Sequence, residues 1–208
     1  MKKVILLISF ILLSSCISIK NSTPDRTFAF DKNSEKGLVS GTFSFYSDKK
    51  KSPYDHYYYN IKYISDDINE VKKNSTSLVF YMDGFNGRYN GQFNDSKTYM
   101  FILDLKPGKY EINSFRFFWN GGMIQQNVNS KIYFSIPFEV KKGEIFYLGE
   151  FIQDMENKNV KPFIKIKDNF ERDKSYFRQN YNLIFWNNAQ NKVIKEGNNG
   201  EGLIEFAN

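Results

Sequence analysis

The chain has 208 residues, of which 41% are hydrophobic, 18% aromatic and 25% charged, a balance that excludes wholesale disorder and predicts one folded domain with short extensions. One cysteine and one histidine exclude a disulfide framework, a multi-cysteine zinc site and a histidine-rich metal site, so we expect no metal and no cofactor. The net charge of +6 comes mainly from lysines spread along the chain. Because lysine suits phosphate recognition less well than arginine, we expect a solvated surface and no nucleic-acid partner.

The first 15 residues have the three parts of a secretory signal peptide. Lys2 and Lys3 give a positive start, residues 4–13 (VILLISFILL) are an apolar run, and small residues follow. Even the longer stretch 4–19 is shorter than the roughly 20 residues that a helix needs to cross a bilayer. We therefore expect residues 1–15 to be a cleaved signal peptide.

The signal peptide ends in a motif that resembles the lipobox of bacterial lipoproteins, Leu13-Ser14-Ser15-Cys16. The resemblance implies that Cys16 begins the mature chain and carries a thioether-linked diacylglycerol and usually an N-acyl chain, which anchor the protein in membrane lipid. The alternative is an incidental cysteine in an ordinary signal peptide. An Asp after the cysteine is typical of inner-membrane retention in Gram-negative envelopes. Ile17 stands there instead, which implies the outer membrane, or the outer face of the plasma membrane in a Gram-positive host.

The next segment reads as a linker. Residues 20–36 are polar, contain a proline and show no sustained period. We therefore expect residues 16–36 to be the lipidated N-terminus with a flexible tether, and residues 37–208 to be the folded domain. Phe28 and Phe30 lie two residues apart, as in a short first strand, or contact a partner.

Alternation of apolar and polar residues predicts strands through most of the domain, because successive side chains of a strand face opposite sides. The expected strands are residues 39–45, 57–63, 78–82, 99–105, 110–117, 132–140, 144–152 and 163–167. In the run Tyr57-Tyr58-Tyr59 we expect the outer two rings to be buried and the middle ring exposed. A change of phase near residues 113–114 predicts a bulge, and Pro137 predicts an edge strand because it cannot donate to the ladder.

Late in the chain the pattern changes to that of a helix. Asp168 and Glu171 resemble a capping box, and the apolar spacing that follows predicts a helix over residues 169–180. Residues 203–206 can add a last strand. Seven or eight short strands with frequent turns predict a mainly β fold, an antiparallel β-sandwich of prealbumin or Ig-like type with one short C-terminal helix.

Two segments support this fold by resemblance. Residues 105–112 (LKPGKYEI) resemble the strand–turn–tyrosine motif of prealbumin-like and carboxypeptidase-regulatory-like sandwich domains. Residues 138–149 (FEVKKGEIFYLG) are similar to a hairpin of uncharacterised bacterial envelope lipoproteins of that shape. The resemblance spans roughly residues 100–180, and it implies a fold and no catalytic residue.

No group of residues in the sequence is typical of catalysis. His56 falls on the strand face that alternation assigns to solvent, so we expect a surface histidine. The chain has no Gly-x-Ser-x-Gly motif, and Asp66 and Asp67 lie in a polar stretch where solvated loop acids are expected. Residues 83–88 lack the spacing of an EF-hand. We therefore expect no catalytic residue and no enzyme.

The loop at residues 83–93 (DGFNGRYNGQF) is the strongest candidate for binding. Its glycines allow sharp turns, and its aromatic, Asn and Arg side chains can stack on sugars or hold a peptide. A long hairpin with Asn-Gly turns explains the same residues. The candidate ligand-binding residues are Phe85, Asn86, Arg88, Tyr89 and Trp119.

These observations together predict a lipid-anchored, non-enzymatic protein of the bacterial cell envelope that contacts another envelope protein or has a structural role. The alternative is a glycan- or peptidoglycan-binding module that uses residues 83–93. A hydrolase built on a pair of carboxylates is the third hypothesis.

Overall fold

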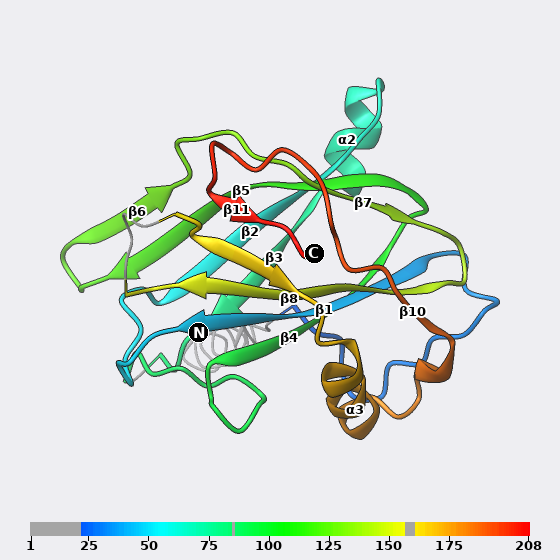
Figure 1. Ribbon diagram of the computed structural model, residues 1–208, viewed down its shortest axis with the longest axis horizontal. Coiled ribbons are helices and arrows are strands. Elements are labelled where there is room, and N and C mark those ends of the chain that lie inside the picture. The colour runs from blue at the N-terminus through cyan, green and yellow to red at the C-terminus, as the bar shows by residue number, and fades with distance from the viewer. Residues whose placement is uncertain (1–21, 85, 157–160) are drawn as a thin grey trace, which may run out of the picture.

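The computed structural model of the protein describes residues 22–84, 86–156 and 161–208. These residues form two β-sheets that share an apolar core, with the two α-helices at opposite ends of the view (Figure 1). The predicted signal peptide and Cys16 lie outside the described residues. Within the described ranges, no helix is long and apolar enough to span a membrane.

The first sheet has six strands in the order β11-β9-β8-β1-β4, with β10 paired to β8. They are β1 (Gly37–Tyr46), β4 (Thr98–Leu105), β8 (Ile145–Asp154), β9 (Ile164–Lys167), β10 (Ala189–Asn191) and β11 (Ile204–Glu205). The second sheet has five strands in the order β3-β2-β5-β6, with β7 paired to β5. They are β2 (His56–Tyr63), β3 (Thr76–Tyr81), β5 (Gly108–Asn120), β6 (Gln125–Asn129) and β7 (Ile136–Val140). The helices are α2 (Ile68–Asn74), α3 (Phe170–Asn180) and a 3₁₀-helix, η1 (Trp186–Asn188).

The two facing sheets confirm the predicted mainly β fold, but the expectation that all strands are antiparallel is wrong. In the first sheet, β1 and β10 run parallel to β8, and β11 runs parallel to β9. Every pair in the second sheet is antiparallel. Parallel neighbours need a long crossover connection, and here the chain visits the second sheet between β1 and β8. Side-chain alternation carries no information on strand direction, so it could not reveal this crossover.

Each expected strand region contains a strand, with one clear difference. The expected strand over residues 132–140 is shortened to β7, and β6 precedes it. Alternation did not predict β6 because its sequence, QQNVN, is polar apart from one valine, and all five residues are exposed. Pro137 lies on β7, which pairs with no strand of the described residues other than β5, and this confirms the predicted edge strand.

The predicted bulge in β5 is also confirmed. Asn60 of β2 pairs with Ser114, whereas the next residue, Ile61, pairs with Ile112. Asn113 is therefore the extra residue of the bulge. The shift keeps the apolar residues on both sides of the bulge facing the core.

The main core lies between the sheets and is rich in aromatic rings. The ring of Phe43 on β1 has its centroid 4.1 Å from that of Tyr59 and 5.2 Å from that of Phe80, both on the second sheet. A second core lies on the other face of the first sheet, where α3, η1 and Phe30 cover β1, β4 and β8. Because β1 and β8 are covered on both faces, they are buried almost continuously.

The predicted C-terminal helix is confirmed as α3, but its capping box is not. Asn169 is the N-cap residue and makes no hydrogen bond through its side chain. The backbone N–H of Phe170 instead donates to Oδ1 of Asp168 at 3.1 Å. Glu171 still lies in the first turn, where the helix dipole favours a negative charge.

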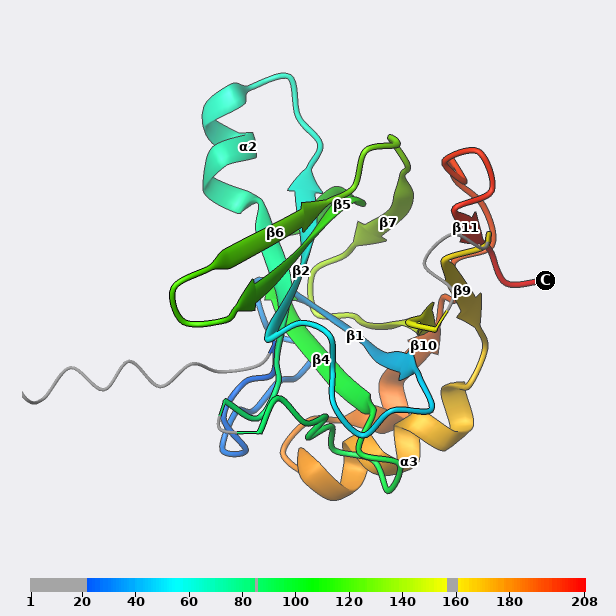
Figure 2. The same cartoon turned by 90° about the vertical axis from the view of Figure 1, so that its left-hand side faces the viewer.

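The expectation of a single helix is wrong, because α2 begins directly after Asp66 and Asp67. These two residues are exposed and precede the helix, as predicted for solvated loop acids. Asp67 caps this short helix by accepting a hydrogen bond from the backbone N–H of Asn69 at 2.8 Å. Figure 2 shows α2 projecting from the end of the sheets, and none of its residues is buried. The helix therefore buries no apolar face, and its seven residues are too few to show the period of 3.6 on which helix prediction depends.

Part of the segment expected to be a tether is packed on the domain. The backbone N–H of Ser22 donates to the carbonyl of Val79, and the N–H of Ile102 donates to the carbonyl of Ser22. Phe30 is buried in the second core and forms a single parallel bridge with Ile184. The remaining tether residues, 16–21, lie outside the described residues.

Candidate functional site

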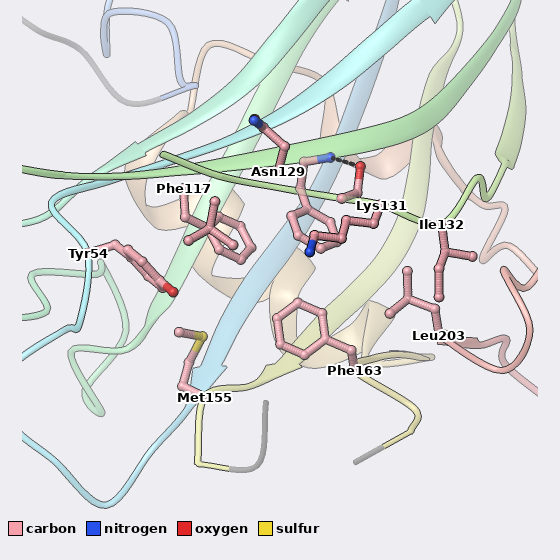
Figure 3. Close-up of a pocket in the computed structure, with 11 residues that line it drawn as sticks. Tyr54, Phe117, Asn129, Lys131, Ile132, Met155, Phe163 and Leu203 are labelled. Atoms are coloured by element: carbon pink, nitrogen blue, oxygen red, sulfur yellow. Dashed lines mark hydrogen bonds between the residues drawn. The ribbon is translucent and has the colours of Figure 1, made fainter. Parts of the chain in front are cut away.

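The main candidate site is an apolar cleft of about 350 Å³ at one edge of the sandwich, between the two sheets (Figure 3). Its floor consists of buried apolar side chains. Phe115 and Phe117 come from the inner face of β5, Tyr54 precedes β2, Met155 follows β8, and Phe163 precedes β9. Residues from both sheets therefore build the site.

The aromatic rings of the floor form a continuous surface. The ring centroids of Phe115 and Phe117 are 4.6 Å apart, with the two planes stacked at 8°. Phe163 lies 5.5 Å from Phe115, and Tyr54 lies 5.3 Å from Phe117. Alternation on β5 places Phe115 and Phe117 on the same face, and the bulge at Asn113 keeps them in phase with the core residues before it.

The walls of the cleft are apolar side chains nearer to solvent. Val128 of β6 is 39% exposed, and Ile132 and Leu203 line the other end of the cleft. Val128 pairs with Phe117 across the β5–β6 ladder, so the hairpin carries one wall and part of the floor. The cleft thus widens from a buried aromatic floor to an accessible mouth.

One positive charge lies at the mouth. The N–H of Ser130 donates to the carbonyl of Phe115 at 3.0 Å, and the N–H of Phe115 donates to Oγ of Ser130 at 3.3 Å. This pair fixes the segment that carries Lys131, whose exposed side chain runs along the cleft wall in Figure 3. Within the described residues, no carboxylate pairs with Lys131.

This arrangement suits a ligand with two parts. An apolar pocket with a few polar groups is the usual form of a small-molecule site, in which the apolar part supplies affinity and the polar part fixes orientation. The aromatic floor can hold a hydrocarbon chain or ring, and the ammonium group of Lys131 can attract an acidic group at the mouth.

In the predicted binding loop, residues 83–93, the aromatic ring of Tyr89 does not face solvent. Tyr89 is only 6% exposed and packs in the main core, 5.8 Å from Phe45 between ring centroids. Burial raises the pKa of the Tyr89 hydroxyl, whose oxygen has no hydrogen-bond partner among the described residues. Phe85 lies outside the described residues.

The loop closes on itself as a tight turn. The N–H of Asp83 donates to the carbonyl of Arg88 at 2.9 Å, and the N–H of Gly87 donates to the carbonyl of Asp83 at 2.7 Å. Gly87 has a φ of +58°, which glycine adopts without strain. Asn86 and Arg88 are exposed, and the amide of Asn86 donates to the Asp83 carboxylate at 3.1 Å. These contacts favour the hairpin explanation of the loop.

Trp119 lies apart from this loop, near the turn between β5 and β6. Its ring packs against Gly121, where an added Cβ would come within 2.2 Å of Cη2. The ring is 36% exposed. Among the contacts of the described residues, none joins Trp119 to Asn86, Arg88 or Tyr89, so the predicted ligand-binding residues do not form one site.

Sequence reasoning missed a buried polar cluster between α3 and the first sheet. Asp173 of α3 has no exposed surface and accepts hydrogen bonds from Thr42 Oγ1 and Tyr147 Oη, both at 2.6 Å, and from Arg172 Nε at 2.7 Å. Burial raises the pKa of Asp173, although these donors act in the opposite direction. A sequence signal was present: Ser40, Thr42 and Ser44 alternate along β1 and so share one polar face, which indicates a polar partner over that face.

A second buried carboxylate completes this cluster. Glu150 of β8 binds Arg172 Nη2 at 3.1 Å and accepts hydrogen bonds from Ser44 and Asn169. Both carboxylates thus have several partners within the protein. Their geometry is that of a structural network that holds α3 on the sheet, as expected for buried charges that are paired and hydrogen-bonded.

His56 lies on the outer face of the second sheet, as alternation predicted, but it is half-buried among aromatic rings. Its ring centroid is 4.7 Å from that of Tyr81 and 5.3 Å from that of Phe118. Burial lowers the pKa of His56, and the neighbouring charge of Asp55 partly opposes this effect. In the described part of the chain, no three His, Cys, Asp or Glu side chains gather as a metal site.

Comparisons with known proteins do not place the chain in a family. No protein-family model and no curated protein matches it. A leucine-rich repeat protein from Bacteroides thetaiotaomicron is similar over 56% of this chain and 13% of that chain, with 11% identity and a TM-score of 0.29. A likeness this weak carries no argument about fold or function.

Proposed function

We propose that the chain is a lipid-anchored, non-enzymatic protein of the bacterial cell envelope whose folded domain works by binding a ligand. The motif Leu13-Ser14-Ser15-Cys16 supports the anchor, and Ile17 after it favours the outer membrane. The cleft between the sheets supports the binding role. The earlier alternative, glycan binding by residues 83–93, has less support because Tyr89 belongs to the core.

The ligand proposed for the cleft is an amphiphile with a hydrocarbon chain and an acidic head group. The observation that carries this proposal is an aromatic floor under a single cation, Lys131, which no carboxylate of the described residues neutralises. Removing a hydrocarbon chain from water contributes roughly 25 cal/mol for each Å² buried. The head group then meets Lys131 at the mouth, where solvent is still close.

The non-enzymatic role is supported by what the chemically capable side chains do in the fold. Asp173 and Glu150 hold α3 on the first sheet, and His56 packs among rings on the outer face of the second sheet. Each of these groups has a role in packing, and none of them lines the cleft.

We propose further that the sandwich is of the prealbumin-like type. Support comes from the turn before β5, where Tyr110 Oη donates to the carbonyl of Lys106 at 2.8 Å. The tyrosine of the predicted strand–turn–tyrosine motif therefore closes its own turn. Burial raises the pKa of Tyr110 to about 12, in keeping with this inward orientation.

Titration calorimetry with laurate tests the cleft. We expect the wild-type protein to bind laurate, and Val128→Asp to weaken binding at least about tenfold, because it places a negative charge in the apolar wall. Lys131→Ala should weaken laurate binding about threefold to tenfold but leave dodecanol binding unchanged, because the alcohol carries no charge.

The matched control is Ile124→Asp. Ile124 lies on the same β5–β6 hairpin, is exposed, and does not line the cleft. It should leave laurate binding unchanged. Absence of laurate binding to the wild-type protein, or equal losses in Val128→Asp and Ile124→Asp, would contradict a ligand in the cleft.

A further inference from the structure

A second surface lies on the outer face of the second sheet, on the side away from the cleft. Cross-strand pairing builds it in rows: Tyr58 of β2 is opposite Val79 on one side and Arg116 on the other, and Arg116 is opposite Asn129 of β6. In the next row, Asn60 is opposite Ser77 and Ser114. Apart from Val79, these residues line a groove of about 340 Å³.

The groove presents polar groups that the protein leaves available. The guanidinium of Arg116 lies over the ring of Tyr58, 4.3 Å from its centroid, which leaves the N–H donors at its edge accessible. Within the described residues, no carboxylate pairs with Arg116, and the side chains of Ser77 and Asn129 make no hydrogen bond. A guanidinium, an amide and a hydroxyl therefore face the same groove.

An aromatic row borders these polar groups. Tyr81, His56 and Phe118 are cross-strand neighbours on β3, β2 and β5. Their ring contacts, 4.7 Å for His56–Tyr81 and 5.3 Å for His56–Phe118, join them into one half-exposed surface. The outer face thus combines an apolar aromatic strip with a strip of hydrogen-bonding groups.

The combination of aromatic rings and hydrogen-bonding groups excludes some classes of ligand and favours another. A hydrocarbon chain would require an apolar groove, and a nucleic acid would require several cations, whereas Arg116 is the one charged side chain among those that line this groove. A sugar ring has an apolar C–H face and a rim of hydroxyl groups. The rings can pack against that face, while planar amide and guanidinium groups bind the hydroxyl and carboxylate groups of the rim.

We propose that this groove binds a carbohydrate chain that carries carboxylate groups, with Arg116 pairing one carboxylate and Asn129 and Ser77 binding neighbouring hydroxyl groups. The groove and the cleft open on opposite faces of the β5–β6 ladder, because successive residues of a strand point to opposite faces of the sheet. Phe115, Asn129 and Ser130 line both, whereas Arg116 lines only the groove and Lys131 only the cleft. It also replaces the loop at residues 83–93 as the place where a glycan binds.

Titration calorimetry with matched oligosaccharides tests this site. The probes are hexagalacturonate, which is acidic, and maltohexaose, which is neutral and of the same length. We expect the acidic chain to bind the wild-type protein and the neutral chain to bind about tenfold more weakly, because it lacks the charge-assisted hydrogen bond to Arg116. Soluble peptidoglycan fragments, which carry carboxylates in an envelope glycan, should bind as hexagalacturonate does.

Two variants and two controls locate the binding. Arg116→Ala and Asn129→Ala should each weaken hexagalacturonate binding, the former by about tenfold or more, while thermal unfolding followed by circular dichroism reports whether each variant is folded. Arg88→Ala removes an exposed arginine of the loop and should change nothing. Val128→Asp should weaken laurate binding at least about tenfold, as above, and spare hexagalacturonate binding, so that the two sites can be tested independently.

The proposal is overturned if neither acidic probe binds, if maltohexaose binds as tightly as hexagalacturonate, or if Arg88→Ala weakens binding as much as Arg116→Ala. Binding of the acidic probes that is lost in folded Arg116→Ala and Asn129→Ala proteins supports it.

Discussion

The three consecutive tyrosines at residues 57–59 show how well the sequence pattern predicted the orientation of individual side chains. Tyr57 and Tyr59 are buried and Tyr58 is half-exposed, as alternation predicted. The buried hydroxyls find partners that alternation could not name: Tyr57 Oη lies 2.6 Å from Ser52 Oγ, and Tyr59 Oη donates to Gln153 of the facing sheet. The orientation of a side chain was therefore predictable, and its polar partner was not.

Cys16 carries the anchoring proposal and gives the first residue-scale prediction. We expect the wild-type protein to incorporate labelled fatty acid, to enter the detergent phase and to sediment with outer membranes. Cys16→Ala should lose the label and the detergent partitioning, because the acyl chains supply the membrane affinity. A Cys16→Ala protein that still partitions into detergent would show that the apolar run, and not a lipid, holds the chain.

His56 gives a second prediction at this scale, on pH. Burial lowers its pKa in the folded protein below the ordinary 6.5, so the folded state binds the proton more weakly than the unfolded state. The contribution of the neutral His56 ring to the free energy of unfolding is therefore present above pH 6.5 and is lost as pH falls through the lowered pKa. Because His56 is the one histidine of the sequence, its NMR signals can be assigned directly. Its titration should have a midpoint below 6.5. A midpoint at or above 6.5 would contradict the packing of His56 between Tyr81 and Phe118.

At the level of secondary-structure elements, helix α3 is held on the first sheet by both apolar and polar contacts. Phe177 of α3 stacks on Trp186, with ring centroids 4.9 Å apart, in the second core. Asp173 is buried on the same helix and joins Thr42 and Tyr147 of the sheet. Apolar periodicity predicted the helix, whereas the position of its buried carboxylate depends on strands more than 25 residues away in sequence.

Removal of this carboxylate should destabilise the protein strongly. Asp173→Ala leaves the buried Thr42 and Tyr147 hydroxyls without their acceptor and removes the carboxylate that Arg172 pairs, so we expect a loss of about 3–5 kcal/mol in the free energy of unfolding, measured with urea. The control, Glu171→Ala, changes an exposed carboxylate two residues earlier in the same helix and should cost less than about 0.5 kcal/mol. Similar losses in the two variants would contradict a role for Asp173 in holding α3.

The strands and the candidate site were predictable to different degrees. Alternation located β1, β2, β3, β4, β5 and β8, and the phase change in β5 located the bulge at Asn113. The cleft was not predicted, because Phe117 and Phe163 approach one another only when β5 and the segment before β9 meet across the core. Residues 83–93 had the composition of a binding loop, but the side chain of Tyr89, in the middle of this segment, is buried in the core.

At the scale of the whole molecule, the unusual feature is the amount of tyrosine in the core. Tyr57, Tyr59 and Tyr99 are fully buried between the sheets, and Tyr147 is buried beneath α3. Burial raises the pKa of each of these hydroxyls above the ordinary 10.0. Their ionisation is therefore coupled to unfolding of the entire domain.

This coupling predicts a limit to stability at high pH. Because the pKa of each buried tyrosine is higher in the folded than in the unfolded state, their contribution to stability is fully present below pH 10 and is lost as pH rises above it. We expect tyrosinate absorbance to rise in two phases, exposed rings first, with the second phase coincident with the loss of circular dichroism. Complete ionisation of the tyrosines while the dichroism is unchanged would contradict the buried positions.

The sequence by itself determined where α3 and most of the strands lie and which face of those strands is apolar, because a period of two or 3.6 residues is a local property of the backbone. The tertiary structure alone decided that β1 runs parallel to β8, that Thr42 is buried under α3, and that the cleft and the outer groove lie on opposite faces of the β5–β6 ladder. Strand order, direction and partners depend on contacts between distant segments, and no local pattern encodes those contacts.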